Sequence, residues 1–331
     1  MSEPATADLP AWHRCEIDRK AFKGLTRRDD RTALVWLAGH LALLAALGVL
    51  AWVALGTWWA VPAFLAYGIV HSFLEAPVHE MHHGTPFRSR RLNEALHTVL
   101  AYAIMKEPVY DRWAHTFHHS FTALDGDEEI ELPRPTSLRQ LVVNFLSWDF
   151  LTTHPVIAVR HAFGRIDART RRIVPESEHR RMVWSSRGFV AVYAGIGLWC
   201  VLGQTWLPLV YTVLARVFGR GLGMYFVGLT QHAGLADGVL DHRLNTRTFL
   251  SNRLVRFLYW NMNYHVEHHM FPQVPFHALP RLHAELKDQM PPPYPGVLAC
   301  WKEMAAVAWR QQREPDFVVR RPLPDAAAAA E

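Results

Sequence analysis

Two pairs of long apolar stretches dominate the pattern of hydrophobic and polar positions along the chain. The stretches are residues 31–55, 58–74, 188–203 and 206–229. Those of the first pair are each near the roughly 20 residues that an α-helix needs to span a membrane. The pattern predicts an all-α integral membrane protein with four crossings in two hairpins. Arg216 and Arg220 interrupt the last stretch, where a bent or re-entrant helix is the alternative.

The polar segments around these stretches divide the chain into three parts. We expect a cytosolic N-terminal arm at 1–30, a membrane domain at 31–290 and a C-terminal cytosolic segment with a disordered end at 291–331. The arm is polar and charged, so it is not expected to be a cleaved secretory signal. The apolar segment 95–105 is too short to span and is expected to lie at the interface. The polar segments would form a cytosolic helical cap.

Basic residues flank the apolar stretches and predict the orientation of the protein. Lysines and arginines precede the first stretch and follow the second, whereas the turn at 56–57 carries no charge. By the positive-inside rule, both termini and the cap face the cytoplasm, and we expect a bacterial inner-membrane protein. The net charge of +5 arises from these flanks, so we expect the lipid bilayer and no nucleic acid as a partner. The 3 widely spaced cysteines give no disulfide framework.

Three copies of the pattern His-x-x-His-His occur among the 20 histidines. On a helix, positions i, i+3 and i+4 share one face, so each copy would aim three imidazoles at one point. A shuffled chain of this composition would contain about 0.07 such copies, so chance is a poor explanation. The copies are His79, His82 and His83; His115, His118 and His119; and His265, His268 and His269.

The number of histidines indicates more than one metal ion. Nine imidazoles exceed what a single four-coordinate zinc site uses, and no cluster of thiolates accompanies them, so we expect two ions. Imidazole suits iron, copper, zinc and nickel, which leaves the metal open. His232, at the end of the last apolar stretch, is a candidate additional ligand, with Gln231 beside it as a supporting residue. In the third copy, Glu267 is a candidate catalytic group and Asn263 a candidate supporting residue.

Other polar residues near the histidines are candidates for supporting roles. His71 and Glu75 share a helical face with His79, so we expect Glu75 to be catalytic and His71 to lie beneath the metal. A snorkelling interfacial pair is the alternative. Asp127 and Glu128 follow the second copy and are candidate catalytic residues, which could also orient metal-bound histidines through their free ring N–H groups. A solvated acidic loop is the alternative for these two.

The boxes HEMHHG, HTFHH and HVEHH, in this order, resemble those of the membrane fatty acid desaturase superfamily. The resemblance covers roughly residues 71–286. It implies two iron ions that activate O₂ as co-substrate, use two electrons from an external donor and abstract hydrogen from an unactivated carbon. The first box of the superfamily usually pairs histidines four or five apart, which makes His82 a supporting residue. The implied iron ligands are His79, His83, His115, His118, His119, His232, His265, His268 and His269.

The resemblance extends to a bacterial branch, with one departure from the wider pattern. Some acyl-CoA desaturases carry an asparagine four residues before the extra histidine, where this chain has Gly228, which puts the iron spacing or a bridging water in doubt. The strings HHGTPFRSRRLNE and NMNYHVEHHMFP look closer to a branch that includes rhizobitoxine-type desaturases and rhizopine-catabolism oxygenases. That branch implies small polar substrates as well as acyl chains.

The source of electrons is expected to be a separate protein. The chain contains no cytochrome b5-like His-Pro-Gly-Gly segment and no cysteine-rich iron–sulfur motif. The resemblance implies a ferredoxin, in particular a Rieske-type one, with its reductase. Basic residues around Arg88 and between Arg169 and Arg181 could dock an acidic partner, positive-inside loops being the alternative.

Several functions stay open on the sequence alone. The first is desaturation of an acyl chain or related lipid, and the second is hydroxylation or oxidative demethylation of a small polar substrate. His79-Glu80-x-x-His83 also matches the zinc-protease signature with Glu80 as general base, but that leaves two boxes unexplained. A non-enzymatic metal-binding membrane protein would place ligands near the bilayer midplane. His71 and Glu75 favour a short or polar-headed substrate, because an apolar chain would bury them without partners.

Overall fold

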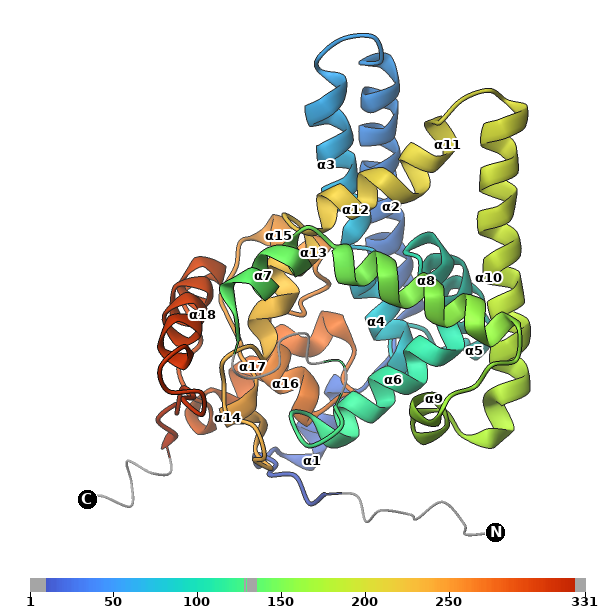
Figure 1. Cartoon of the computed structure of the whole chain (residues 1–331). Helices are drawn as coiled ribbons and strands as arrows, with labels where there is room; N and C mark the ends of the chain where they lie inside the picture. The colour runs from blue at the N-terminus through green and yellow to red at the C-terminus, as the bar shows by residue number, and fades with distance from the viewer. Residues whose placement is uncertain (1–9, 128, 130–135, 325–331) are drawn as a thin grey trace.

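In the part of the chain that the structure describes, three helices are long and apolar enough to cross a membrane. The computed structural model describes residues 10–127, 129 and 136–324. The candidate spans are α2 (Asp30–Val53), the stretch Ala60–His83, which contains α3 (Ala60–Ser72) and α4 (Glu75–His83), and α10 (Glu176–Leu202). All three project from one side of a helical body (Figure 1). The described residues form helices and no named strand, which confirms the all-α membrane class.

Local sequence signals explain where the spans begin and end. The Asp29 carboxylate caps α2 by accepting a hydrogen bond from the Arg31 N–H at 3.0 Å. After α2 the chain turns at Gly56, whose φ of 80° suits glycine. Pro175 precedes α10, and Glu176 and Glu178 lie in its first turn, where carboxylates favour the helix dipole.

The fourth apolar stretch is a broken helix rather than a straight crossing. It contains α11 (Leu207–Leu209), the π-helical η1 (Val210–Leu214), α12 (Ala215–Arg220) and α13 (Met224–Gly228), with a break between α12 and α13. The bent helix of the sequence-based alternative is therefore what the structure contains, whereas the count of four crossings stays a prediction. The break brings Arg216 and Arg220, both buried, to Glu75.

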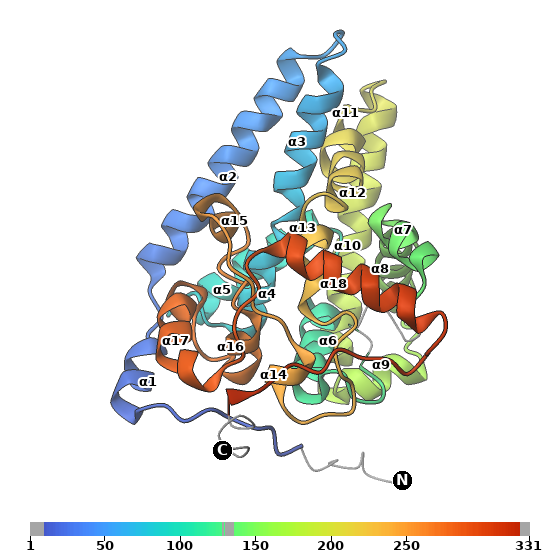
Figure 2. The ribbon, with the colours of Figure 1, turned by 90° about the vertical axis from the view of Figure 1, so that its left-hand side faces the viewer.

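The cap packs around one large apolar core beneath the spans. Leu74, Met81, Phe87, Trp260 and Phe276 are among its buried members. The short apolar segment predicted to lie at the interface forms most of α5 (Arg90–Ala103), which does not span. Figure 2 shows α18 (Val297–Gln311) crossing one face of the cap, where it contacts α7 (Leu138–Phe145) and η2 (Leu229–Gln231).

The remaining elements complete the cap. They are α1 (Arg19–Leu25), α6 (Pro108–Phe121), α8 (Trp148–Ala162), α9 (Ala168–Ile173), α14 (His242–Asn245), α15 (Arg253–Leu258), α16 (His265–Met270), η3 (Phe276–Ala278), α17 (Leu279–Leu286) and η4 (Lys287–Gln289). The N-terminal arm is docked on this body, because the Trp12 indole N–H donates to the Ser120 carbonyl at 3.1 Å. The end expected to be disordered, residues 325–331, lies outside the described residues.

Candidate metal centre

The three His-x-x-His-His copies lie on three helices that meet inside the cap. The first ends α4, which stops at Gly84 because its φ of 64° is left-handed. The second lies on α6, whose start is capped by the Glu107 carboxylate and set by Pro108. The third forms α16, in which every residue is buried. Each helix presents its histidines on one face, as the spacing predicts.

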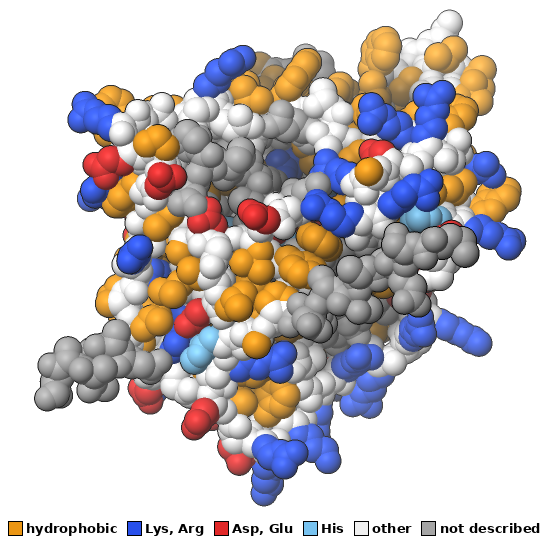
Figure 3. Space-filling view, turned by 60° about the horizontal axis from the view of Figure 1, so that its bottom comes forward, with side chains coloured by type: hydrophobic (Ala, Val, Ile, Leu, Met, Phe, Trp, Pro, Cys, Tyr) orange, Lys and Arg blue, Asp and Glu red, His pale blue; other side chains and the backbone are white. Residues whose placement is uncertain are grey.

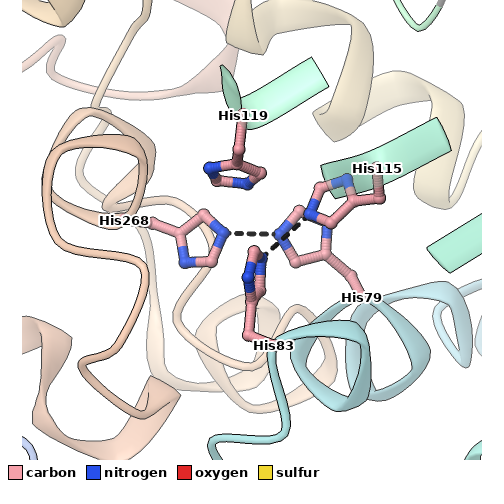
Figure 4. A group of neighbouring side chains, drawn as sticks. All are labelled: His79, His83, His115, His119 and His268. Carbon is pink, nitrogen blue, oxygen red and sulfur yellow. Dashed lines mark hydrogen bonds between the residues drawn. The ribbon is translucent and has the colours of Figure 1, made fainter. Parts of the chain in front are cut away.

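The first group of histidines draws on all three copies. The ligand atoms of His79, His83, His115, His119 and His268 all lie within 4.8 Å of one another (Figure 4). The Nε2 atoms of His79 and His268 are 2.7 Å apart, and those of His83 and His115 are 2.9 Å apart. Several imidazole nitrogens thus point at one small volume, which is how helices build a metal site.

The second group lies directly beside the first. The ligand atoms of His118, His232 and His269 lie within 4.8 Å of one another. His265 joins them, because its Nε2 atom is 3.1 Å from the Nε2 atom of His269. The rings of His119 and His269 stack at 4.2 Å and link the two groups. The structure therefore brings all nine predicted ligands into two adjacent clusters.

The other ring nitrogen of several histidines is held by a fixed partner. The Nδ1 atom of His118 is 2.8 Å from the Asp127 carboxylate, and that of His115 is 3.0 Å from the Glu129 carboxylate. The Nδ1 atom of His232 donates to the Asn245 carbonyl at 3.0 Å. A ring that donates through Nδ1 keeps the Nε2 lone pair for a metal, so these contacts set the tautomer that a ligand needs.

Two further rings are oriented by neutral side chains. The Nδ1 atom of His269 lies 3.2 Å from the Thr122 hydroxyl, which itself donates to the His118 carbonyl. The Nδ1 atom of His265 lies 3.2 Å from the Gln231 side chain. Gln231 is therefore placed behind the ring, as a supporting residue, and not among the clustered nitrogens.

Burial makes these imidazoles neutral. Desolvation is the largest cause that lowers the pKa of His119, His265 and His269 well below the ordinary value, and neighbouring histidines add to it. Burial likewise lowers the pKa of His232 and His268 to about 3. Neutral imidazole is the form that binds metal, so each ring is ready as a ligand.

The ion pair between His118 and Asp127 shifts the pKa values of both groups in favour of their charged forms. Burial would lower the pKa of His118, but the Asp127 charge and hydrogen bond outweigh it and raise this pKa. Burial opposes ionisation of Asp127, yet His118 lowers the pKa of that carboxyl. For Glu129 burial dominates and raises the pKa to about 7.

Unpartnered nitrogens test whether the histidines fit a metal. Among the described residues, both ring nitrogens of His119 and the Nε2 atom of His232 are buried without a hydrogen-bond partner. Buried polar atoms normally find partners, and orphaned ones call for an explanation such as an ion. An all-imidazole donor set suits a borderline transition metal, so the residues fit metal ions at both clusters.

The other predicted site residues lie outside the two clusters. His82 contacts Asp111 through its Nε2 atom at 3.1 Å, behind the first cluster. Asn263 donates from its side chain to the Phe249 carbonyl at 2.8 Å. Glu267 accepts from Thr248 and pairs with His283. All three therefore support the fold around the clusters.

The remaining predictions fall on the membrane side of the site or outside the described residues. His71 is buried in α3 and belongs to neither cluster. Glu75 is paired with Arg216 and with Arg220, and its catalytic role stays a prediction. Glu128 lies outside the described residues.

Sequence reasoning missed several groups around the clusters. Thr122 and Asn245 are uncharged residues whose partners lie far along the chain, so no local signal marked them. Glu80, proposed as a protease base, accepts hydrogen bonds from Thr85 and from the Phe276 N–H and lies 3.7 Å from the Nδ1 atom of His268. This carboxylate thus lies behind a clustered histidine.

A cavity with charged, polar and apolar lining residues opens beside both clusters. It has a volume of about 230 Å³, and His79, His118 and His232 contribute to its wall. A substrate in this cavity would therefore lie next to the clustered histidines.

Comparisons with known proteins give a consistent picture. A family model described as "Fatty acid desaturase" matches residues 56–301. The chain is 25% identical to Homo sapiens "Sphingolipid delta(4)-desaturase/C4-monooxygenase DES2" over 296 residues, which cover 85% of this chain and 83% of the relative. It is also 25% identical to Drosophila melanogaster "Sphingolipid delta(4)-desaturase DES1" over 274 residues, covering 77% of this chain and 76% of the relative.

Proposed function

The chain belongs to the fatty acid desaturase family, and from this premise we propose that it is an O₂-dependent enzyme with two iron ions in its histidine clusters. The family and its relatives confirm the prediction of a membrane desaturase or hydroxylase. The observation that carries the metal proposal is the pair of adjacent clusters of converging imidazole nitrogens.

The nine histidines of the two clusters are the proposed iron ligands. His79, His83, His115, His119 and His268 would hold one ion, and His118, His232, His265 and His269 the other. When bound there, two iron ions would supply the O₂-dependent, two-electron chemistry that removes hydrogen from an unactivated carbon. In desaturation, the two removed hydrogens, two electrons, two protons and O₂ give two water molecules, whereas hydroxylation inserts one oxygen atom and gives one.

Residues of the chain would position the ligands and keep out bulk water. Asp127 and Glu129 fix the rings of His118 and His115 through Nδ1. Trp12, from the N-terminal arm, stacks on His242 at 4.1 Å, and His242 in turn lies against the ring of His269. This layer covers the second cluster from outside, which favours controlled use of O₂.

Two substrate classes deserve testing. The printed names of the relatives describe sphingolipid desaturases, which favours an acyl chain or related lipid as substrate. The charged wall of the cavity instead favours a small polar substrate, which the same centre would desaturate, hydroxylate or oxidatively demethylate.

We place the enzyme in a bacterial inner membrane with the clusters and both termini in the cytoplasm. The domain limits at 1–30, 31–290 and 291–331 are part of this proposal. A ferredoxin, in particular a Rieske-type one, and its reductase would deliver the electrons. Figure 3 supports such docking, since lysine and arginine side chains are spread over the face away from the spans.

Metal analysis combined with turnover tests the proposed function. Protein purified from iron-supplied cells should contain about two iron atoms per chain, as a centre with two ligand clusters requires. With a chemical reductant it should consume O₂. One zinc ion and no iron would favour the protease alternative, and weak, variable metal binding without O₂ uptake would favour a non-enzymatic metal-binding protein.

A further inference from the structure

The wall of the cavity beside the histidine clusters contains two ion pairs among aromatic and aliphatic side chains such as Phe117 and Ile157. The Lys106 ammonium contacts the Asp111 carboxylate at 3.0 Å, and the Arg220 guanidinium contacts the Glu75 carboxylate at 3.3 Å. A hydrocarbon chain placed here would strip water from these charges without replacing its hydrogen bonds. A polar molecule could supply such bonds.

The end of the cavity toward the spans is closed. Arg216 is fully buried behind Glu75, to which it is bonded, and its guanidinium lies over the Phe150 ring at 4.4 Å. The three residues Glu75, Arg216 and Arg220, here called the charged plug, thus separate the cavity from the membrane helices.

The close packing of α3 against α12 also blocks the end of the cavity that points toward the spans. A Cβ atom at Gly68 of α3 would overlap the Ala215 carbonyl of α12, and one at Gly219 would overlap the Gly68 backbone. Where two backbones touch in this way, no alkyl chain fits between the helices. A separate apolar groove of about 400 Å³ lies between α2, α3 and η1, and none of its lining residues lines the cavity.

The opposite end of the cavity reaches water. Arg169 contributes to the cavity wall and is exposed, and the Glu129 side chain, also in the wall, is 30% exposed. The volume of about 230 Å³ is below the range of pockets that hold drug-sized ligands. The space is therefore suited to a compact molecule that arrives from solvent.

We propose that the substrate is a compact, polar, water-soluble molecule that enters past Arg169, and that the charged plug excludes long acyl chains. This inference rests on the proposed function, since the cavity is taken to serve the iron centre. Lysine and arginine face aspartate and glutamate in the wall, so a neutral or zwitterionic polar substrate matches the cavity better than a bare anion.

Cysteine labelling of the full chain in lipid nanodiscs tests the route. Thr153→Cys adds a thiol to the cavity wall, and Leu44→Cys adds one to the apolar groove. A charged methanethiosulfonate should modify the first at least about ten-fold faster than the second, because labelling needs aqueous access. Wild type gives the background, since all three native cysteines are buried.

Protection of the Thr153→Cys thiol tests the substrate class. Members of a panel of amino acids, amino sugars and polyols of small size should slow its labelling, whereas stearoyl-CoA and a C18 ceramide should not. In the same background, the triple variant Glu75→Leu, Arg216→Met, Arg220→Leu replaces the charged plug with apolar residues and should gain protection by stearoyl-CoA. Protection of the single Thr153→Cys protein by stearoyl-CoA or ceramide, or labelling no faster than at position 44, would overturn the inference.

Iron content and O₂ uptake, measured on the same preparations, separate the two proposals. Protein without iron that nevertheless shows the predicted labelling and protection would contradict the proposed function and leave the polar cavity in place. Iron-loaded, O₂-consuming protein whose Thr153→Cys thiol is protected by ceramide would support the proposed function and overturn the inference of a polar substrate.

Discussion

Several clustered histidines have one ring nitrogen among the clustered nitrogens and the other, Nδ1, beside a fixed partner, and the effect of that partner on metal binding can be measured. Asp127 accepts from His118, and a neutral asparagine there would lose the charge that fixes this ring. Replacement of such partners typically costs 10–100-fold in metal affinity, so Asp127→Asn should lower iron affinity by about that factor. Competition with a chelator measures it. Asp125→Asn, two residues away and exposed, is the matched control; equal losses in both would contradict the role of Asp127.

Removal of a clustered imidazole should reduce iron binding and turnover more than removal of its hydrogen-bond partner does. His268 contributes its Nε2 atom to the first cluster and is fully buried, so His268→Ala removes a proposed ligand and leaves a void. We expect the variant to lose roughly half or more of the bound iron and all turnover, because a metal site that lacks one of its ligands binds the ion less tightly. His179→Ala, which removes a ring bonded only to the Val174 carbonyl, is the control. Full iron content in His268→Ala would refute its assignment.

At the scale of helices, the contact between α3 and α12 depends on glycine. Alanine usually stabilises a helix by about 1 kcal/mol relative to glycine. At Gly68 the added methyl would overlap the Ala215 carbonyl, so Gly68→Ala should destabilise the protein by about 1–3 kcal/mol. Thermal unfolding in detergent measures this. Gly197→Ala on α10 has open space around it and should be neutral or stabilising; similar melting of the two variants would contradict the packing argument.

The charged plug also joins two helices, and breaking it from one side should be costly. Glu75→Gln leaves Arg216, which is fully buried, without its carboxylate. Such one-sided loss typically costs about 3–5 kcal/mol, so the variant should melt well below wild type. Glu94→Gln removes a carboxylate whose side chain is 29% exposed and pairs with Arg112 and Arg181, and it should cost about 1 kcal/mol or less. An equally small loss at Glu75 would show that the pair is not a structural link.

Local patterns predicted the helices and the histidine faces, because both follow from spacing within one element. The partners across elements were not predictable in this way. Glu75 and Arg216 are separated by 141 positions in the sequence, and Thr122 and His269 by 147. From the sequence alone, Arg216 and Arg220 could be recognised only as interruptions of an apolar stretch.

At the scale of the whole molecule, the clusters lie in the cap, away from the far ends of the spans. The connection between α2 and α3 lies at the far end of the spans (Figure 1). Trp58 and Trp59 are exposed there, and Trp206 is exposed in the connection that follows α10. Tryptophan favours both membrane–water interfaces, so these residues indicate one interface at the far end of the spans. The cytoplasmic side of the clusters stays a prediction, which rests on the arginines that flank the spans.

The orientation predicts which positions an impermeant reagent reaches in intact cells. Thr57→Cys lies in the exposed turn between α2 and α3, and Asp125→Cys lies in the exposed turn after α6. The flanking arginines should retain the cap in the cytoplasm, because moving many positive charges across the membrane is disfavoured. A membrane-impermeant maleimide should therefore label Thr57→Cys in intact cells and Asp125→Cys only after permeabilisation. Wild type provides the background, since its three cysteines are buried. Labelling of Asp125→Cys in intact cells, with Thr57→Cys protected, would place the clusters outside and contradict a cytoplasmic electron donor.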